Sequence, residues 1–324
     1  MENSENTTPA KPFYDGLLSV IVPCKNEVEA IPVFYGEFKK VMQGMGSPKY
    51  ELIFVEDGST DGTLDLLRRM SKEDPSVRFI SFSRNFGKEA AMYAGLKSAR
   101  GDYVTIMDVD LQDPPSLLPD MFSAIISEGY DSVASRRCTR CGEPPMRTHA
   151  ARLFYKILNS LSDLKFKEGA RDYRLMTRRV LDAILGLEEY NRFIKGMYEW
   201  VGFKTKWIDY ENVPRAAGET KWSNFGLLVY SLNALTSFST VPLVMAALVG
   251  IALCALSGLG IIFVIIRQLL EPGSSQWGWP SMVCIMLFLS GMQLFCLGVL
   301  GHYMSKIYLE TKRRPAYIVR ETSE

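Results

Sequence analysis

Cysteine and histidine are sparse in this sequence, and its charges nearly cancel. The 324 residues include six cysteines and two histidines. The cysteines are scattered, which excludes the dense disulfide framework of a small secreted domain. Cys138 and Cys141 form a zinc-like pair, but no second pair follows at the spacing of a structural zinc centre. Because 37 basic residues face 36 acidic ones, a polybasic surface over the whole chain is excluded, and no nucleic-acid partner is expected.

Two nucleotide-binding fingerprints and a secretory signal are also missing. No G-x-G-x-x-G follows the first apolar run, and no G-x-x-x-x-G-K-[ST] occurs, which argues against a dinucleotide site and a P-loop. Residues 1–12 are polar and acidic and lack the basic-then-apolar pattern of a secretory signal. We therefore expect residues 1–16 to form a flexible N-terminus in front of a cytoplasmic domain.

Charge is absent from two long tracts in the last third of the chain. Residues 241–266 are almost wholly apolar. Residues 280–304 contain no aspartate, glutamate, lysine or arginine, and a single histidine, His302. As a helix, the first tract would be about 39 Å long, which exceeds the roughly 30 Å hydrocarbon core of a bilayer. A buried helix of a soluble protein is the alternative, but such helices are usually shorter and have a polar stripe. Residues 240–305 are thus predicted to form a two-helix transmembrane hairpin.

The segments around the two tracts predict the orientation of the hairpin. The tail at residues 306–324 is rich in lysine and arginine, whereas the linker between the tracts has one cation and one acid. By the positive-inside rule, the tail and the N-terminal domain both lie on the cytoplasmic side of the plasma (inner) membrane. Residues 223–239 are uncharged and partly polar, so we expect them to lie along the membrane interface. Glycines in both tracts would allow close helix packing within the hairpin or between the subunits of a homo-oligomer.

Four short apolar runs precede the hairpin. They are rich in β-branched and aromatic side chains, alternate with stretches of helical periodicity, and cover residues 17–23, 51–55, 77–82 and 103–107. Continuous apolar strands that alternate with helices predict an α/β domain with a doubly wound parallel sheet, here over residues 17–222. Such sheets bind ligands beyond the carboxyl ends of their strands.

Acidic residues follow the second and fourth runs. Asp57 comes soon after the second run, and Asp108 and Asp110 come directly after the fourth. On an extended segment, two residues that are two positions apart leave the same face, so both carboxylates could bind one divalent ion. Gln112 continues the alternation and would add a neutral oxygen. The pattern predicts a Mg²⁺ or Mn²⁺ site, with a hydrated turn before Pro114 as the alternative.

Calcium is a weaker interpretation of the residues after the second run. Asp57-x-Ser59-x-Asp61 begins like an EF-hand loop, but position twelve of that loop is Arg68, where a bidentate glutamate is required. Taken alone, residues 57–62 are equally consistent with a glycine-rich turn that caps the following helix.

Six motifs, in order along the chain, resemble those of one family. They are SVIVPCKNE (19–27), VEDGSTDGT (55–63), SRNFGKEAA (83–91), DVDLQDPP (108–115), DYRLM (172–176) and GETKWS (218–223). Together with the two apolar tracts, they resemble family-two glycosyltransferases of the GT-A fold that charge polyprenyl phosphate, such as bactoprenol glucosyltransferases and dolichol-phosphate mannose synthases. The resemblance extends over nearly all of residues 18–320.

The resemblance also implies roles for individual residues. It assigns nucleotide-sugar binding to Pro23, Glu27, Asp57 and Asp108, metal binding to Asp108, Asp110 and Gln112, a catalytic role near the acceptor to Asp172, and binding of diphosphate or lipid phosphate to Arg136, Arg215 and Lys221. The local sequence alone leaves other readings open. Asp172 could form an ion pair with a neighbouring arginine, and Arg215 and Lys221 could anchor the chain to anionic lipid.

The reaction implied by the resemblance is a metal-dependent, inverting glycosyl transfer. We expect a sugar, most simply glucose from UDP-glucose, to pass to the phosphate of undecaprenol or another polyprenol. GDP-mannose, UDP-N-acetylglucosamine and an aminoarabinose derivative are alternative donors. A processive polysaccharide synthase is a rival interpretation, but its Q-x-x-R-W motif is missing. If the acidic edge of the sheet binds no ligand, the protein would instead be a non-enzymatic membrane scaffold.

Overall fold

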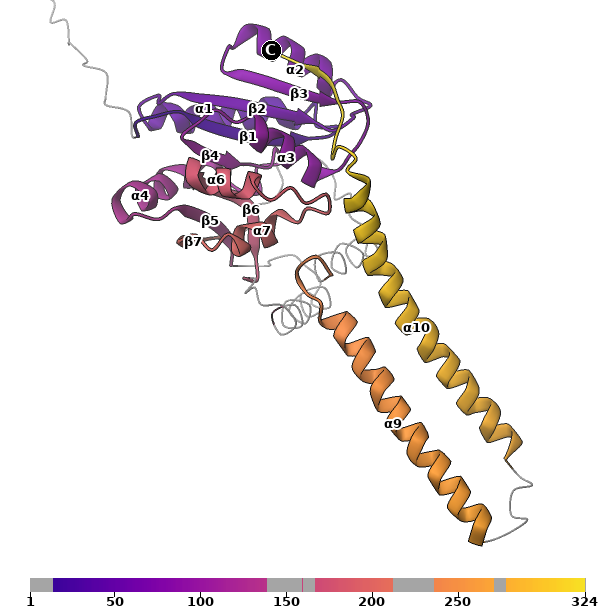
Figure 1. The fold of residues 1–324 in the computed structure, drawn as a ribbon. Helices are drawn as coiled ribbons and strands as arrows, with labels where there is room; N and C mark the ends of the chain where they lie inside the picture. The colour runs from indigo at the N-terminus through magenta and orange to yellow at the C-terminus, as the bar shows by residue number, and fades with distance from the viewer. Residues whose placement is uncertain (1–13, 139–158, 160–166, 212–235, 271–277, 324) are drawn as a thin grey trace, which may run out of the picture.

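A mixed α/β domain with two long helices projecting from it makes up the chain (Figure 1). The computed structural model describes residues 14–138, 159, 167–211, 236–270 and 278–323. The sheet has eight strands in the order β7-β5-β6-β4-β1-β2-β3-β8. The strands are β1 (Leu18–Cys24), β2 (Tyr50–Glu56), β3 (Val77–Phe82), β4 (Tyr103–Ile106), β5 (Ser132–Arg137), β6 (Ala170–Thr177), β7 (Thr205–Tyr210) and β8 (Val319–Thr322).

The four apolar runs form the parallel centre of the sheet. β3, β2, β1 and β4 lie side by side in that order, and each neighbouring pair is parallel. Their side chains are almost all buried because helices cover both faces. The predicted doubly wound α/β arrangement is therefore confirmed for this part of the chain.

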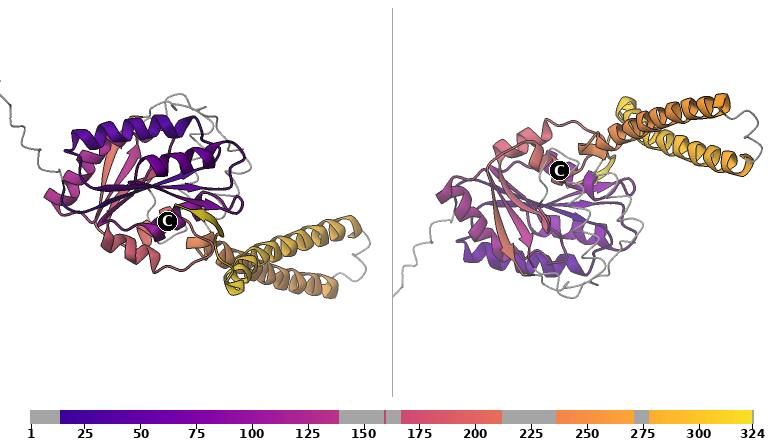
Figure 2. Two further views of the ribbon diagram at one scale, coloured as in Figure 1. Left: turned by 90° about the horizontal axis from the view of Figure 1, so that it is seen from above. Right: turned by 90° about the horizontal axis from the view of Figure 1, so that it is seen from below.

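Helices cover the two faces of the sheet in two groups (Figure 2). One face carries α1, α2 and α4, and the other carries α3, α6 and α7. In α1 the buried residues Ile31, Phe34, Phe38 and Met42 recur every three or four positions, the spacing that places side chains on one helix face. The helices of the domain are α1 (Ala30–Gly44), α2 (Thr63–Glu73), α3 (Lys88–Ser98), the 3₁₀ turn η1 (Pro115–Leu117), α4 (Leu118–Glu128), α6 (Arg178–Leu185) and α7 (Ile194–Trp200).

The strands beyond β4 give the sheet its mixed character. β6 runs antiparallel to both β4 and β5, and β7 adds to β5 in parallel. In the β4–β6 pair, Ile106 lies opposite Arg174. The start of β6 therefore lies at the same edge of the sheet as the carboxyl end of β4.

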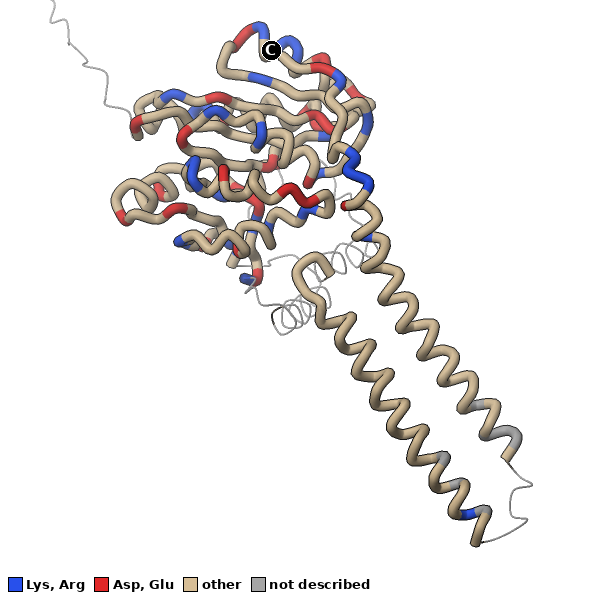
Figure 3. The backbone as a smooth tube through the Cα atoms, in the orientation of Figure 1, with Lys and Arg blue, Asp and Glu red and all other residues tan. Residues whose placement is uncertain are grey.

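Two helices, α9 (Val241–Leu270) and α10 (Trp279–Lys312), form the projecting hairpin. Within them, Val241–Arg267 and Ile285–Lys312 have mean hydropathies of 2.7 and 1.7 and are long and apolar enough to cross a membrane. None of either apolar window is buried, and Figure 3 shows almost no charge along the hairpin between its two ends. Their exposed apolar surface contradicts the alternative of buried helices in a soluble core.

The glycines of the hairpin do not bring α9 and α10 together. A Cβ atom added at a glycine of the hairpin would meet no atom of another segment within 4 Å. This holds for Gly250, Gly258, Gly260, Gly291, Gly298 and Gly301. These glycines therefore do not pack α9 closely against α10, which was one of the two roles expected for them. The two helices are in contact elsewhere, where the Cys296 thiol lies 3.7 Å from the carbonyl oxygen of Ala246.

A short segment before α9 joins the hairpin to the domain. Of the predicted interfacial segment, residues 223–235 lie outside the described residues, whereas residues 236–238 form a helical turn. Phe238 packs so closely on α7 that a Cβ at Gly196 would lie 2.3 Å from its ring. On the other side, Lys306 Nζ of α10 donates to Ser237 Oγ at 2.9 Å.

The carboxyl end of α10 contacts the domain directly. Glu310 accepts hydrogen bonds from the backbone N–H groups of Tyr190 and Asn191 at 3.0 and 3.1 Å. A cavity of about 340 Å³ lies at this junction, between the 189–191 loop, residues 236–237 and α10. The hairpin is thus fixed to the domain at its base.

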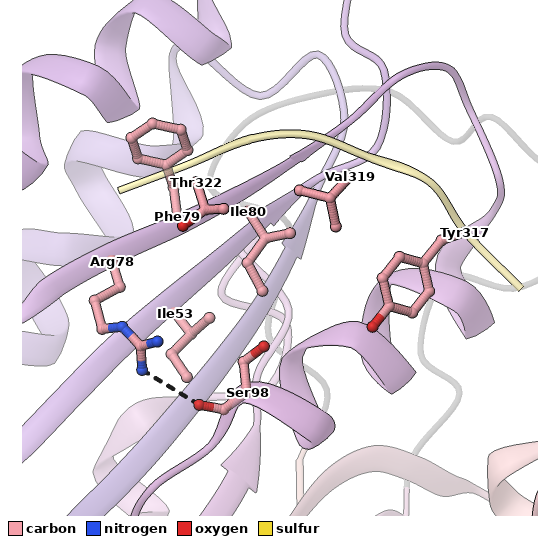
Figure 4. Close-up of a pocket in the computed structure, with 8 residues that line it drawn as sticks. All are labelled: Ile53, Arg78, Phe79, Ile80, Ser98, Tyr317, Val319 and Thr322. Carbon is pink, nitrogen blue, oxygen red and sulfur yellow. Dashed lines mark hydrogen bonds between the residues drawn. The ribbon is translucent and has the colours of Figure 1, made fainter. Parts of the chain in front are cut away.

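After α10, the chain returns to the sheet. β8 pairs antiparallel with β3, and Arg68 of α2 forms a two-pronged ion pair with Glu321 at 2.8 and 2.5 Å. The ring of Tyr317 stacks on that of Phe82 with centroids 4.9 Å apart. A cavity of about 90 Å³ lies between β3, the end of α3 and residues 317–322 (Figure 4). The tail is part of the sheet of the α/β domain, which the sequence analysis did not predict, and it lies at the same end of the hairpin as the domain.

Candidate active site at the carboxyl edge of the sheet

The predicted site residues gather where β1, β2 and β4 end. Because these strands are parallel, their carboxyl ends lie at one edge of the sheet. Asp57 follows the last residue of β2, and Asp108 comes two positions after the last residue of β4. This is the edge at which doubly wound sheets bind ligands.

Asp172 faces Asp108 because of the antiparallel pairing of β4 and β6. Ile106 of β4 lies opposite Arg174 of β6. Asp108 comes two positions after Ile106 and Asp172 two positions before Arg174, so the antiparallel register brings these two aspartates level with each other. The ammonium group of Lys88 lies between the two carboxylates, 2.7 and 2.9 Å from the oxygens of Asp108 and 2.7 Å from Oδ2 of Asp172. Two residues that the sequence analysis assigned to different substrates therefore share one cation.

Lys88 is the first residue of α3, and Asp57 holds the loop that precedes it. The Asp57 carboxylate accepts the backbone N–H of Phe86 at 2.6 Å and that of Gly87 at 2.9 Å. Burial raises the pKa of Asp57, and these two N–H groups oppose the rise. Besides its predicted part in nucleotide binding, Asp57 therefore positions the loop that supplies Lys88.

Asp172 has two cationic neighbours. Lys195 Nζ lies 3.7 Å from Oδ1, on the side of the carboxylate away from Lys88. Burial alone would raise the pKa of Asp172, but the charges of Lys195 and Lys88 hold it well below its ordinary value. Arg174 pairs instead with Glu199 at 3.3 Å. The ion pair with a neighbouring arginine, suggested by the local sequence, is therefore replaced by pairs with two lysines.

Glu89 adds a second carboxyl group close to Asp172. Its Oε2 accepts the backbone N–H of Ile194, the first residue of α7, at 3.0 Å. Burial and then the charge of Asp172 raise the pKa of Glu89 to about 7, against the lowering effect of this N–H. Glu89 therefore titrates near neutral pH beside an aspartate that stays ionised.

The residues after β4 form a turn, not the extended segment that the alternation argument assumed. β4 ends at Ile106, and Leu111 has a positive φ of 57°. Asp110 Oδ1 accepts the backbone N–H of Gln112 at 3.1 Å. Asp108 and Asp110 are both partly exposed on either side of the buried Val109, so a turn produces the shared exposure that the sequence analysis attributed to strand alternation.

A buried ion pair supports this turn. Arg171 Nε donates to Asp113 at 2.9 Å, and its terminal nitrogen reaches Gln112 Oε1 at 3.3 Å. The Tyr210 hydroxyl donates to the same Asp113 carboxylate, whose side chain is 1% exposed. Sequence reasoning missed this group because its members come from three separate segments. The one hint in the sequence was the charged Asp113 beside two prolines, which the sequence analysis interpreted only as part of a hydrated turn.

The loops after β1 and β2 are joined at the predicted nucleotide side. Asn26, at a positive φ of 54°, donates its N–H to Ser59 Oγ at 3.0 Å and accepts from Thr60 N–H at 2.8 Å. The Glu27 N–H bonds to Thr63 Oγ1 at 3.0 Å. Pro23 lies within β1, opposite Val55 of β2. The predicted contacts Pro23, Glu27 and Asp57 thus lie on adjacent, connected segments.

The predicted phosphate-binding residues have different placements. Arg136, near the end of β5, forms a two-pronged ion pair with Asp209 of β7 at 2.6 Å. Arg215 and Lys221 lie outside the described residues. In the described part of the chain, no three histidine, cysteine, aspartate or glutamate side chains converge as a metal centre. A divalent ion at Asp108 and Asp110 would therefore take further ligands from its substrate or from water.

The fold and this edge define a GT-A type of transferase, and comparison with known proteins identifies the family. Residues 19–185 match glycosyl transferase family 2. The chain belongs to that family, as the sequence motifs predicted. Bactoprenol glucosyl transferase of Shigella phage SfV is 39% identical over 307 residues, which cover 95% of this chain and 99% of that protein.

Other relatives match over a similar length. The prophage bactoprenol glucosyl transferase homolog of Escherichia coli K12 is 37% identical, over 95% of this chain and 99% of that protein. Uncharacterized glycosyltransferase YkcC of Bacillus subtilis is 40% identical, over 94% and 93%. Among solved structures, the mannosyltransferase PcManGT from Pyrobaculum calidifontis, in complex with GDP-Man and Mn²⁺, has a TM-score of 0.44 and 16% identity, over 92% of this chain and 90% of that one.

Proposed function

We propose that the protein transfers glucose from a nucleotide diphosphate sugar, first of all UDP-glucose, to the phosphate of a polyprenyl lipid. The observation that carries this proposal is the match to bactoprenol glucosyl transferases over 94–95% of the chain. A match of that length includes the apolar hairpin as well as the catalytic domain. A protein that shared only the nucleotide-sugar chemistry would not need to share the hairpin.

The arrangement of the hairpin supports action at a membrane surface. Both apolar helices lie beyond the domain, and β8 brings the chain back to the sheet after the second helix. This supports the proposal that the domain and the tail lie on one side of the membrane, and the basic residues of the tail favour the cytoplasmic side. The acceptor phosphate would reach the enzyme from the cytoplasmic leaflet.

The residues after β4 fit a divalent ion such as Mg²⁺ or Mn²⁺. Asp108 already has a cation, the Lys88 ammonium, within 2.9 Å of both carboxylate oxygens, so its position attracts positive charge. Hard oxygen ligands from one or two carboxylates, completed by substrate phosphates, are typical of such ions. Asp108 and Asp110 would hold the ion, with Gln112 beside them. When bound, it would neutralise charge on the diphosphate leaving group.

Asp172 is suited to orienting the acceptor. Because Lys195 and Lys88 keep its carboxylate ionised, its low pKa makes it a weak proton acceptor at neutral pH. A phosphate monoester has a second pKa of about 6 and is already largely anionic at pH 7, so its attack needs little help from a base. Lys88 and Lys195 would offset the repulsion between Asp172 and the acceptor phosphate. Attack opposite the leaving group then inverts the anomeric carbon.

Positive charge for the phosphates comes from other segments. Arg136 could contact diphosphate once its ion pair with Asp209 opens, because both side chains are exposed by more than a third and such a pair is weak. Lys221, within the family motif GETKWS, and Arg215, three residues before that motif, are proposed to bind diphosphate or lipid phosphate.

Product analysis tests the proposal. The purified full-length protein is incubated with labelled undecaprenyl phosphate and, separately, with UDP-glucose, GDP-mannose, UDP-N-acetylglucosamine and the UDP-aminoarabinose derivative. Mass spectrometry of the lipid should show a single added hexose with UDP-glucose. A lipid product formed only with another donor would change the sugar assignment, and a long polymer or no lipid product with any donor would refute the proposal.

A further inference from the structure

Lys88 contacts carboxylates on both sides of the catalytic edge, but the proposed function uses its charge only beside Asp172. Its ammonium group contacts Asp108, a proposed metal ligand, and Asp172, the proposed acceptor-side residue. No other described side chain contacts both of these carboxylates by the hydrogen bonds and ion pairs of the structure. The side chain is 39% exposed, so a ligand can reach it.

The backbone around Lys88 leaves it little freedom to move as a whole. The residue begins α3, and the loop before it is held by the two hydrogen bonds from Phe86 and Gly87 to Asp57. The adjacent Glu89 accepts the N–H of Ile194 and so ties the same turn to α7. Movement of the ammonium group must therefore come from rotation of the lysine side chain.

A divalent ion and the Lys88 ammonium cannot both occupy their places on Asp108. The ammonium lies within hydrogen-bond distance of both oxygens of that carboxylate, and an ion such as Mg²⁺ bound there would need at least one of them at a distance of about 2.0–2.1 Å. Two cations that close repel strongly in a partly desolvated site. The lysine has a second anionic partner, Asp172, on which it can remain.

We propose, on the basis of the function proposed above, that Lys88 is a positioning residue that joins Asp108 to Asp172 in the ligand-free enzyme and leaves Asp108 when a divalent ion binds. Its ammonium then stays with Asp172 alone. Lys195 faces the other oxygen of Asp172, so Asp172 keeps two cationic neighbours. Asp108 then has the divalent ion in place of the lysine. Lys88 thus makes metal binding and the arrangement of the acceptor side depend on one another.

Metal binding without turnover tests the displacement. Free Mn²⁺ is measured by electron paramagnetic resonance with the full-length protein and UDP, for wild type, Lys88→Met, Lys88→Arg and Lys97→Met. Lys97 lies near the other end of α3 and is exposed, so it controls for the loss of a positive charge. Removal of the competing cation should tighten Mn²⁺ binding by about tenfold in Lys88→Met, while Lys88→Arg and Lys97→Met stay close to wild type.

The possible results separate this proposal from the proposed function. Equal Mn²⁺ affinity in wild type and Lys88→Met, or weaker binding in Lys88→Met, overturns the displacement and leaves the glycosyl transfer unaffected. No Mn²⁺ binding by any of the proteins overturns the displacement together with the metal of the proposed function. Thermal unfolding of each variant shows whether it is folded.

Chemical labelling tests the bridge itself and needs neither metal nor sugar. Brief treatment with an amine-reactive ester, followed by mass spectrometry of peptides, compares the labelling rates of Lys88 and Lys97 in the same protein. The bridge protects Lys88, so it should react several-fold more slowly than Lys97 and should become more reactive in Asp108→Asn and on addition of Mn²⁺ with UDP. Equal rates for the two lysines in the ligand-free wild type would overturn the bridge.

Discussion

Arg171 and Asp113 form an ion pair at 2.9 Å that joins the start of β6 to the turn after β4. The carboxylate is almost completely buried, whereas a quarter of the arginine side chain is exposed. The same guanidinium reaches Gln112. The turn that presents the proposed metal ligands is therefore held from the strand that carries Asp172, and the two halves of the site share one support.

Replacing Arg171 by Met should destabilise the domain at neutral pH. Loss of the arginine leaves the Asp113 charge buried without its partner, which should cost about 2–4 kcal/mol of unfolding free energy. Burial, opposed by Arg171, already raises the pKa of Asp113, so the cost should shrink as acid protonates this carboxyl group. Chemical unfolding of the purified protein at pH 5 and pH 7.5 measures both effects.

Two variants serve as controls for Arg171→Met. Lys40→Met removes an exposed ion pair with Glu37 on α1 and should change stability by no more than about 1 kcal/mol. Adding Asp113→Asn to Arg171→Met should recover part of the loss, because a neutral amide is easier to bury. If the double variant were as unstable as the single one at both pH values, the ion pair would not be the source of the effect.

Asp110→Asn should abolish metal-dependent transfer with little effect on folding. The amide can still accept the Gln112 N–H but carries no charge for a divalent ion. We expect the rate of sugar transfer to fall by about 100-fold or more. The measurement is glucosyl transfer to polyprenyl phosphate over a range of Mg²⁺ and Mn²⁺ concentrations, with the exposed Asp120→Asn as the matched control. Undiminished turnover would contradict the assignment of Asp110 to the metal.

Glu89→Gln should change how stability depends on pH. The pKa of Glu89 is raised from 4.5 to about 7 in the folded protein, so between these values the folded state binds more protons than the unfolded state. Stability from this group is therefore present below about pH 4.5 and is lost as the pH rises to 7, by up to about 3 kcal/mol. Glutamine keeps an acceptor for the Ile194 N–H and removes the titration.

The pH dependence of thermal unfolding between pH 4.5 and pH 8 measures this effect. Wild type should lose more stability across that range than Glu89→Gln does. Glu73→Gln, on the exposed face of α2, should follow the wild-type curve. Parallel curves for wild type and Glu89→Gln would show that Glu89 titrates at its ordinary pKa.

Tyr317→Ala should weaken the attachment of the tail to the sheet. The ring stacks on Phe82 and meets Tyr93 edge-on at 6.1 Å, and aromatic pairs add about 0.5–1.5 kcal/mol each beyond the burial of their area. For the two pairs together we expect a loss of about 1–3 kcal/mol in unfolding free energy. Thermal unfolding and limited proteolysis after α10 measure it, with the more exposed Tyr190→Ala for comparison. Unchanged stability and cleavage would mean that the tail is held by β8 alone.

The central sheet and the hairpin could be predicted from the sequence because their signals are local. The residues from Leu18 to Cys24 form a continuous apolar run, and residues 241–266 contain no charge. The position of β6 could not be predicted in this way, because Asp172 reaches Asp108 only through antiparallel pairing with a strand far away in sequence. The same holds for β8, whose four residues carry no strong strand pattern and are stabilised by β3 and Arg68.

The site was predicted by residue type more readily than by arrangement. Asp108, Asp110 and Asp172 were identified from motifs, but the Lys88 bridge and the Arg171–Asp113 pair depend on contacts between separate segments. The turn after Ile106 also replaced the expected strand alternation. Motifs identify which groups are present, whereas their partners follow from the register of the sheet.

The pairing of β8 with β3 also has a consequence for the order of biosynthesis. β8 follows both apolar helices in the chain, so the outer edge of β3 is left open until the ribosome has produced the entire hairpin. The hairpin must turn back toward the domain before β8 can reach that edge. A chain whose second helix did not return would therefore retain an uncovered strand at the edge of the sheet.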